Sequence, residues 1–160
     1  MDAQSPTPGH ELVVPREWID YSEHMNVGNY LLAFELAAAQ FFERIGLGES
    51  YRKRTDHSYF AVESHITYLA EASLGDRLRF THQLLAFDDK RVRVFDRMIR
   101  DRDGRLAATH EVVYVHVDLT RRRAAPCPEE GLRILVQATA AHARLPWPAE
   151  AGRAIVKPAP

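Results

Sequence analysis

A single long apolar segment, Val27 to Ile45, most constrains how this chain can fold. Apolar residues recur along it at alternating spacings of four and three, and further apolar residues widen that surface almost all the way round. Asn26 before the segment is a good helix N-cap, and Gly46 after it suits the position that follows a helix. A helix with so little polar surface must be covered by other elements, so the rest of the chain has to wrap it.

Beyond this segment the hydrophobic period changes to two residues, which is the period of a β-strand. Turn signals, among them Asp103-Gly104, separate the apolar stretches. The expected strands are 11–14, 58–68, 77–87, 91–100 and 105–118, and a short closing helix is expected at 129–143. One apolar helix followed by an antiparallel meander predicts an α+β fold in which a curved sheet wraps the helix.

The first strand after the helix alternates between an apolar and a polar face. Its apolar face is expected to hold Phe60, Val62, Ile66 and Tyr68. Glu63 and His65 are two residues apart, so they share the opposite face. If that face lines a ligand pocket, Glu63 could position water or attract a cation. A solvated strand face explains the same pattern equally well.

Length and composition predict one globular domain, because 160 residues of which 46% are hydrophobic can bury a substantial core. Residues 1–10 are rich in proline and small residues, so we interpret them as a flexible lead-in. The domain is expected to span 11–145, and 146–160 is expected to form a proline-containing tail.

Charge and cysteine content argue against several functional classes. The 21 basic and 22 acidic residues give a net charge of −1, which provides no overall field for binding nucleic acid or a membrane surface. The apolar run 31–42 is too short to span a bilayer. Cys127 is the only cysteine and cannot form an internal disulfide, and residues 1–10 lack the pattern of a secretion signal. We therefore expect a cytoplasmic protein.

The segment 20–26, Asp-Tyr-Ser-Glu-His-Met-Asn, places chemically active side chains directly before the apolar helix. An ordinary Asp pKa of about 3.9 keeps Asp20 ionised at neutral pH, so it can serve as a base or a nucleophile. An aspartate at such a position can also simply hold a turn. His24 could orient Asp20 or a substrate, or act only as a hydrogen-bond anchor.

The start of the helix offers backbone N–H groups that can stabilise a developing oxyanion. We nominate the backbone around Asn26, Val27 and Gly28 for this role, while the Asn26 side chain acts chiefly as the cap. Gly28 weakens the first helical turn by up to about 1 kcal/mol relative to alanine, which close approach of a ligand would explain. A frayed first turn is the alternative.

Segment 20–26, with Tyr30 downstream, resembles the Asp-x-x-Gly-His-x-Asn…Tyr signature of the 4-hydroxybenzoyl-CoA-thioesterase-like family. Residues 63–69 and the Leu-Gly-Asp turn at 74–76 are similar to that family's second strand and turn. The sequence departs from the signature at Glu23, where the family usually has glycine. More narrowly, the chain resembles the betainyl-CoA thioesterases of bacterial carnitine breakdown.

The resemblance implies a hotdog fold and hydrolysis of a small acyl-CoA, with Asp20 activating water or attacking the thioester carbonyl. It implies no metal and no cofactor, since coenzyme A is part of the substrate. Glu35 is a backup carboxylate, because some hotdog thioesterases carry theirs on the helix; pairing with an arginine is its alternative role. The resemblance also implies a homodimer or homotetramer with the pocket between subunits.

A betainyl group carries a quaternary ammonium, which cannot accept hydrogen bonds and is recognised by aromatic faces and nearby carboxylates. The aromatic candidates are Trp18, Tyr30, Tyr59 and Tyr68, with Tyr21 and Phe60 in addition, and Glu63 and His65 are the polar candidates. Any of the aromatic residues can equally be core. Arg121, Arg122 and Arg123 could bind the phosphates of coenzyme A, or could simply keep the surface soluble.

Two other functional classes fit the same fold. A hotdog hydratase or dehydratase would need a histidine and a carboxylate placed to move a proton next to the carbonyl, and the Asp20 motif argues against it. A module that binds acyl-CoA without turnover would keep the pocket but not release the thiol.

Overall fold

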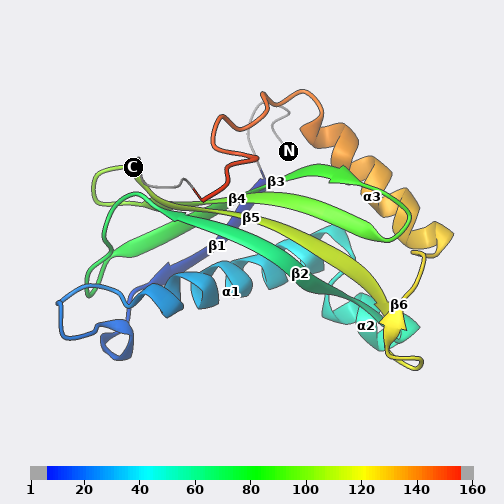
Figure 1. Ribbon diagram of the computed structural model, residues 1–160, viewed down its shortest axis with the longest axis horizontal. Coiled ribbons are helices and arrows are strands. Elements are labelled where there is room, and N and C mark those ends of the chain that lie inside the picture. The colour runs from blue at the N-terminus through cyan, green and yellow to red at the C-terminus, as the bar shows by residue number, and fades with distance from the viewer. Residues whose placement is uncertain (1–6, 156–160) are drawn as a thin grey trace.

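A curved antiparallel sheet wraps one side of the long helix in the computed structural model, which describes residues 7–155 (Figure 1). The helix α1 spans Val27–Ile45. The strands are β1 Thr7–Val13, β2 His57–Tyr68, β3 Arg77–Phe87, β4 Arg91–Arg100, β5 Arg105–Asp118 and β6 Arg123–Ala124. The shorter helices are η1 Arg16–Trp18, α2 Glu49–Thr55 and α3 Glu129–His142. This is the predicted α+β hotdog arrangement.

The strand order in the sheet is β1-β3-β4-β5-β2, and β6 pairs with the far end of β5. Strands β3, β4 and β5 form the predicted meander. Strand β2 precedes them in sequence but pairs with β5, so it occupies one edge of the sheet. The start of α1 lies by the end of β2, where Tyr30 contacts Tyr68, and the end of α1 lies by the start of β2, where Phe42 contacts Tyr59. Helix α1 and strand β2 therefore run in opposite directions (Figure 1).

The bounds of α1, β3, β4 and β5 agree with those predicted, because each end carries a local signal. At the start of α1, Asn26 Oδ1 accepts a hydrogen bond from the Gly28 amide at 2.9 Å. At its end, Gly46 has a φ of 90°, the left-handed conformation that terminates helices. Helix α2, η1 and β6 were not predicted, since none of them has a clear periodic pattern.

The N-terminal boundary differs from the prediction. Residues 7–10, which we expected to belong to the flexible lead-in, form the first part of β1, and Thr7 lies opposite His82 of β3. The open edge of β3 supplies the hydrogen-bonding partners, and a reading of local composition cannot detect such a partner. Residues 1–6 lie outside the described part of the chain.

The predicted faces of β2 are wrong in its first half. A β-bulge between Ala61 and Glu63 inserts one extra residue opposite β5 and reverses the alternation of side chains. Tyr59, before the bulge, therefore packs against Phe42 of α1. Phe60 and Val62, expected in the core, are about half exposed or more, at 51% and 60%.

The sheet covers only one side of α1. Buried side chains of α1, such as Phe34 near its middle and Phe41 near its end, pack on the concave face of the sheet in two apolar clusters. On the other side of the helix four apolar residues are 40–58% exposed, namely Val27, Leu31, Leu32 and Leu36. Within one chain, therefore, only one side of this apolar helix is covered, and the prediction that the chain wraps it is met on that side alone.

The segment after α3 returns across the sheet. The Arg93 guanidinium stacks on the Trp147 ring with 5.4 Å to the ring centroid, and the Gly152 amide donates to Glu111 at 2.6 Å. Residues 146–155, part of the expected tail, therefore contact β4 and β5, and 156–160 lie outside the described residues. Each helix in the described part of the chain is too short or too polar to span a lipid bilayer.

Candidate active site

The chain turns tightly before α1 and brings Asp20 to the helix start. Ile19 and Met25 form an isolated antiparallel bridge, and within it the Asp20 amide donates to the His24 carbonyl at 3.1 Å. Glu23 in this turn has a φ of 66°, in the left-handed region that glycine adopts at no steric cost. Glu23 therefore takes a conformation that suits the glycine of the family signature.

Three polar groups hold the Asp20 carboxylate. The Ser22 amide donates to Oδ1 at 2.9 Å, the Ser22 hydroxyl donates to the same oxygen, and Asn26 Nδ2 donates to Oδ2 at 3.3 Å. These hydrogen bonds, chiefly the two from Ser22, lower the pKa of the Asp20 carboxyl below its ordinary value. The carboxylate is therefore ionised and held beside the residue that caps α1.

Two of the three backbone amides nominated as oxyanion donors are already engaged. The Gly28 amide donates to Asn26 Oδ1, and the Asn26 amide donates to the Trp18 carbonyl at 2.8 Å. The Val27 amide has no hydrogen-bond partner among the described residues. Of the three, Val27 is therefore the donor available to a ligand.

A cleft of about 380 Å³ opens at the helix start; we call it the helix-start cleft, and its walls include His24, Val27, Tyr30, Tyr68, Leu69 and Glu71. His24 Nε2 lies 2.9 Å from the Glu71 carboxylate. The Tyr30 and Tyr68 rings meet edge to face with centroids 5.2 Å apart. The structure thus brings four predicted residues together here. Asp20 is not among the residues of the cleft wall, but Asn26 links it to the helix start.

The Trp18 ring packs against the core, and the Trp18 carbonyl supports the helix start by accepting from the Asn26 amide and from Asn29 Nδ2 at 3.2 Å. Tyr21, by contrast, is fully exposed. Trp18 thus holds the start of α1 in place through its backbone carbonyl.

The polar pair of β2 lies elsewhere. Glu63 and His65 line a different pocket with Arg93, Glu111 and the returning C-terminal segment at Gly152. The helix-start cleft shares no residue with that pocket. The structure therefore does not bring Glu63 and His65 to Asp20.

The arginine cluster Arg121–Arg123 lies at the turn between β5 and β6, by α2 and far from the helix start (Figure 1). All three are exposed, and Arg121 Nε lies 3.6 Å from the Asp118 carboxylate. Cys127 is buried and accepts a hydrogen bond from the Tyr59 hydroxyl at 3.2 Å. Within one chain Tyr59 and the arginine cluster thus lie toward the far end of α1, away from Asp20.

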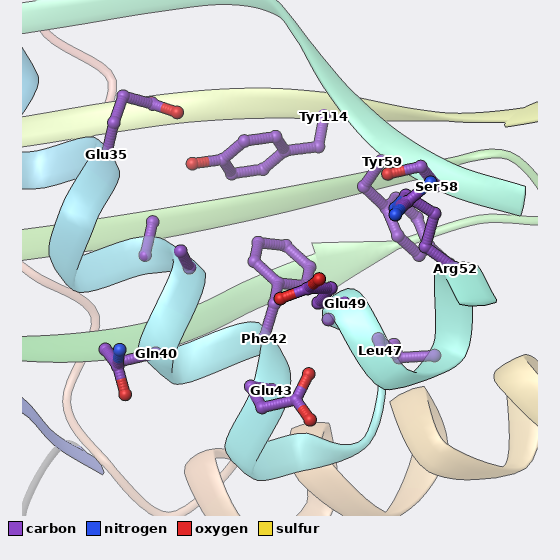
Figure 2. A pocket seen from close by; sticks show the side chains of 13 residues that line it. Glu35, Gln40, Phe42, Glu43, Leu47, Glu49, Arg52, Ser58, Tyr59 and Tyr114 are labelled. Carbon is purple, nitrogen blue, oxygen red and sulfur yellow. The ribbon is translucent and has the colours of Figure 1, made fainter.

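A second pocket, of about 470 Å³, lies toward the far end of α1 (Figure 2). We call it the aromatic pocket, and its walls include Glu35, Phe42, Glu49, Arg52, Tyr59 and Tyr114. Glu35 and Tyr59 were predicted site residues, whereas Phe42 and Tyr114 were not, because in the sequence they fit the apolar pattern of a helix and a strand. Burial raises the pKa of the Glu35 carboxyl. No arginine forms an ion pair with Glu35 among the described residues, so the alternative role that we gave this carboxylate, pairing with an arginine, is not seen.

The core also holds a buried ionisable group that was not predicted from the sequence. His82, Asp96 and His110 lie side by side on β3, β4 and β5. The Asp96 carboxylate is fully buried and lies 2.7 Å from His82 Nδ1 and 3.1 Å from His110 Nδ1. Rings of α1 cover both imidazoles, Phe41 on His82 and Phe34 on His110. None of its three residues is in the wall of either pocket.

The sequence profile of the thioesterase-like superfamily matches residues 14–138, which is most of the chain. The chain belongs to this superfamily. The thioesterase-like protein is 34% identical to the betainyl-CoA thioesterase of Pseudomonas aeruginosa over 149 residues, 93% of this chain and 94% of that relative. It is 36% identical over 153 residues to the L-carnitine dehydrogenase/betainyl-CoA thioesterase of Rhizobium meliloti; these are 96% of this chain but only 31% of that relative.

Among solved structures, a Staphylococcus aureus protein in complex with CoA matches this thioesterase-like protein with a TM-score of 0.86 and 30% identity, covering 99% of this chain and 100% of that one. The predicted fold and the predicted family are thus confirmed.

Proposed function

We propose that this protein is an acyl-CoA thioesterase that hydrolyses betainyl-CoA to betaine and free coenzyme A. The observation that carries the proposal is the ionised Asp20 carboxylate held at the start of α1, beside the free Val27 amide. The relatives named betainyl-CoA thioesterase support the choice of substrate. Water is the only co-reactant, and no metal or cofactor takes part.

The chemistry follows from the charges at the helix start. Asp20 accepts a proton from water as the water oxygen attacks the thioester carbonyl, or its own oxygen attacks and water then cleaves the anhydride. The oxyanion receives a hydrogen bond from the Val27 amide. Collapse of the tetrahedral intermediate breaks the carbon–sulfur bond and releases the thiolate of coenzyme A, which takes up a proton.

The test is thiol release from a panel containing betainyl-CoA, short straight-chain acyl-CoAs and aromatic acyl-CoAs. Asp20→Asn should lower kcat at least about 100-fold, since it removes the base while keeping the shape. Asp88→Asn is the matched control, because Asp88 also accepts backbone hydrogen bonds in an exposed turn, and this β3–β4 turn lies at the opposite end of the sheet from the start of α1 (Figure 1). Full activity of Asp20→Asn would refute the mechanism. Binding of acyl-CoA without thiol release by the unmodified protein would support the binding module instead.

We also propose that the protein acts as a cytoplasmic homo-oligomer paired through β2. Strand β2 is an edge of the sheet, and it carries Phe60 and Val62 exposed. The exposed apolar side of α1 would also be buried by contact with a second copy of the chain. A buried free cysteine, Cys127, suits a reducing compartment.

Two copies joined by antiparallel β2 strands would place each helix start beside the far end of the other helix, because α1 lies along β2 in each copy and the two helices would then also run antiparallel (Figure 1). Val62→Lys should therefore shift the protein toward monomer in analytical ultracentrifugation and lower its activity. Val13→Lys is the control, since Val13 has a similar exposure of 52% but lies on β1 at the other edge. An unchanged mass for Val62→Lys would refute pairing through β2.

A further inference from the structure

The aromatic pocket has three rings that face one cavity from three different elements. Phe42 comes from α1, Tyr59 from β2 and Tyr114 from β5 (Figure 2). The Phe42 ring is stacked on Tyr59 with centroids 5.6 Å apart and meets Tyr114 edge to face at 5.0 Å. The rings thus form one continuous aromatic wall, and aromatic faces attract cations through their quadrupole.

The charges that line this pocket are mainly negative. Glu35, Glu43 and Glu49 contribute three carboxylates and Arg52 contributes one guanidinium. Glu43 is engaged with the Ser50 amide at 3.0 Å, and Glu49 lies 2.7 Å from Lys53 outside the pocket. Neither Glu35 nor Glu43 forms an ion pair with a basic side chain among the described residues, and Glu43 is held by the neutral Ser50. The lining therefore carries an unneutralised carboxylate next to the aromatic wall, which disfavours an anionic ligand and favours a cation.

The third feature is the buried Tyr114 hydroxyl. Tyr114 is only 4% exposed, and its hydroxyl lies close enough to the Glu35 carboxyl to affect the pKa of that carboxyl. Figure 2 shows this hydroxyl pointing toward Glu35 from the opposite wall of the pocket. Here it adds a partially negative oxygen to the side of the pocket where Glu35 lies.

We propose that the aromatic pocket binds a compact quaternary ammonium group, with Phe42, Tyr59 and Tyr114 as the cage and Glu35 as the counter-charge. The ligand is the cationic head of the acyl group, so this inference rests on the proposed function. A trimethylammonium group cannot donate or accept a hydrogen bond, and it needs what this pocket offers: aromatic faces and one fixed negative charge.

The helix-start cleft is the weaker candidate for the same group. It also contains two rings and a carboxylate. However, the Glu71 carboxylate already lies 2.9 Å from His24 Nε2, and the Tyr30 hydroxyl accepts from the Ala72 amide at 3.0 Å. The polar groups of this cleft are therefore already paired with other groups of the protein, and they hold the cleft in shape.

The position of the pocket has a consequence for catalysis. In a betainyl group one methylene separates the ammonium from the carbonyl, so the catalytic acid must lie close to the cage. Glu35 is eight residues into α1 from Val27, which is about 12 Å along the helix, and Phe42 is farther still. Asp20 of the same chain is therefore too far away. A second copy paired through β2 would bring its own helix start to this pocket.

The first test measures binding of choline by calorimetry or by saturation-transfer NMR, with no thioester present. The control ligand is the carbon isostere of choline, in which a tert-butyl group replaces trimethylammonium. Choline should bind and the isostere should bind at least about tenfold more weakly. Tyr59→Leu and Glu35→Gln should each weaken choline about tenfold, while Tyr59→Phe, which keeps the ring, should retain binding. Equal binding of the two ligands would overturn the proposal.

Tyr68→Leu decides between the two pockets, because it removes a ring from the helix-start cleft only. If Tyr68→Leu weakens choline and Tyr59→Leu does not, the cage is assigned to the wrong pocket. Circular dichroism on each variant confirms that it is folded. Since choline binding needs no catalysis, it reports on the cage whether or not betainyl-CoA is hydrolysed.

The second test compares kcat/KM for betainyl-CoA with that for its tert-butyl isostere. The ratio should favour betainyl-CoA in the unmodified protein and fall by about tenfold in Glu35→Gln and Tyr59→Leu. Asp20→Asn should lower both rates and leave the ratio unchanged. A ratio that is unchanged in both cage variants would overturn the cage. Absence of thiol release from every acyl-CoA would instead refute the proposed function.

Discussion

Replacing Asp96 by asparagine should destabilise the protein more than any change to a surface ion pair. The Asp96 carboxylate has no solvent-accessible surface and is held between His82 and His110, which are 0% and 1% exposed. The Asp96→Asn side chain keeps the shape and one accepting oxygen. It loses the negative charge that faces both imidazoles.

The magnitude follows from what remains paired. Removing one partner of a buried ion pair completely costs about 3–5 kcal/mol, and losing a hydrogen bond to a charged group costs about 1.5–3 kcal/mol. Asn retains one of the two hydrogen bonds, so we expect a loss of about 2–3 kcal/mol in the free energy of unfolding. Asp88→Asn is the control, since its pair with Arg91 is exposed to solvent and contributes little to stability.

The assay is urea unfolding followed by circular dichroism at one fixed protein concentration, because pairing of chains would add concentration-dependent stability. A loss of less than about 0.5 kcal/mol for Asp96→Asn at neutral pH would refute the argument, since that is the size expected of a neutral surface change.

The pH dependence of stability provides a second test of the role of Asp96. Burial by itself would raise the pKa of Asp96, but the charges and hydrogen bonds of His82 and His110 outweigh burial and lower it. A lowered pKa in the folded state gives stability that is present above the unfolded value of about 3.9 and is lost as the pH falls through the folded value. The difference between the unmodified protein and Asp96→Asn should therefore shrink below about pH 4.

Three further outcomes are expected. Gly131→Ala should lower the free energy of unfolding by about 1–3 kcal/mol in urea melts, because its Cβ would overlap the buried Cys127 Sγ; an unchanged midpoint would show that the packing can yield. Glu23→Gly should raise the free energy of unfolding by about 1 kcal/mol, and with it the thermal midpoint, because glycine adopts a positive φ without strain; a lower midpoint would contradict this. In pH–rate profiles activity should be lost as the pH falls through the lowered pKa of Asp20, and Ser22→Ala should move that loss to higher pH; an identical acid limb would exclude Asp20 as the titrating group.

The sequence alone determined the elements whose signals are local. The cap at Asn26, the helical period of 27–45 and the left-handed Gly46 define α1 within consecutive residues. Turn residues and a two-residue period likewise define β3, β4 and β5. Segment 20–26 also indicated a carboxylate at the helix start, and Asp20 lies there. These features depend on neighbours in sequence, so composition and spacing suffice to find them.

Only the tertiary structure decided which distant residues share a face or a cavity. The bulge at Val62 depends on the register with β5, and it turned Tyr59 toward the helix. The group formed by Asp96 and its two histidines depends on three strands aligning in register. The aromatic pocket likewise joins rings from a helix and two strands. Register and packing are set by contacts between segments far apart in the chain, and no local pattern records them.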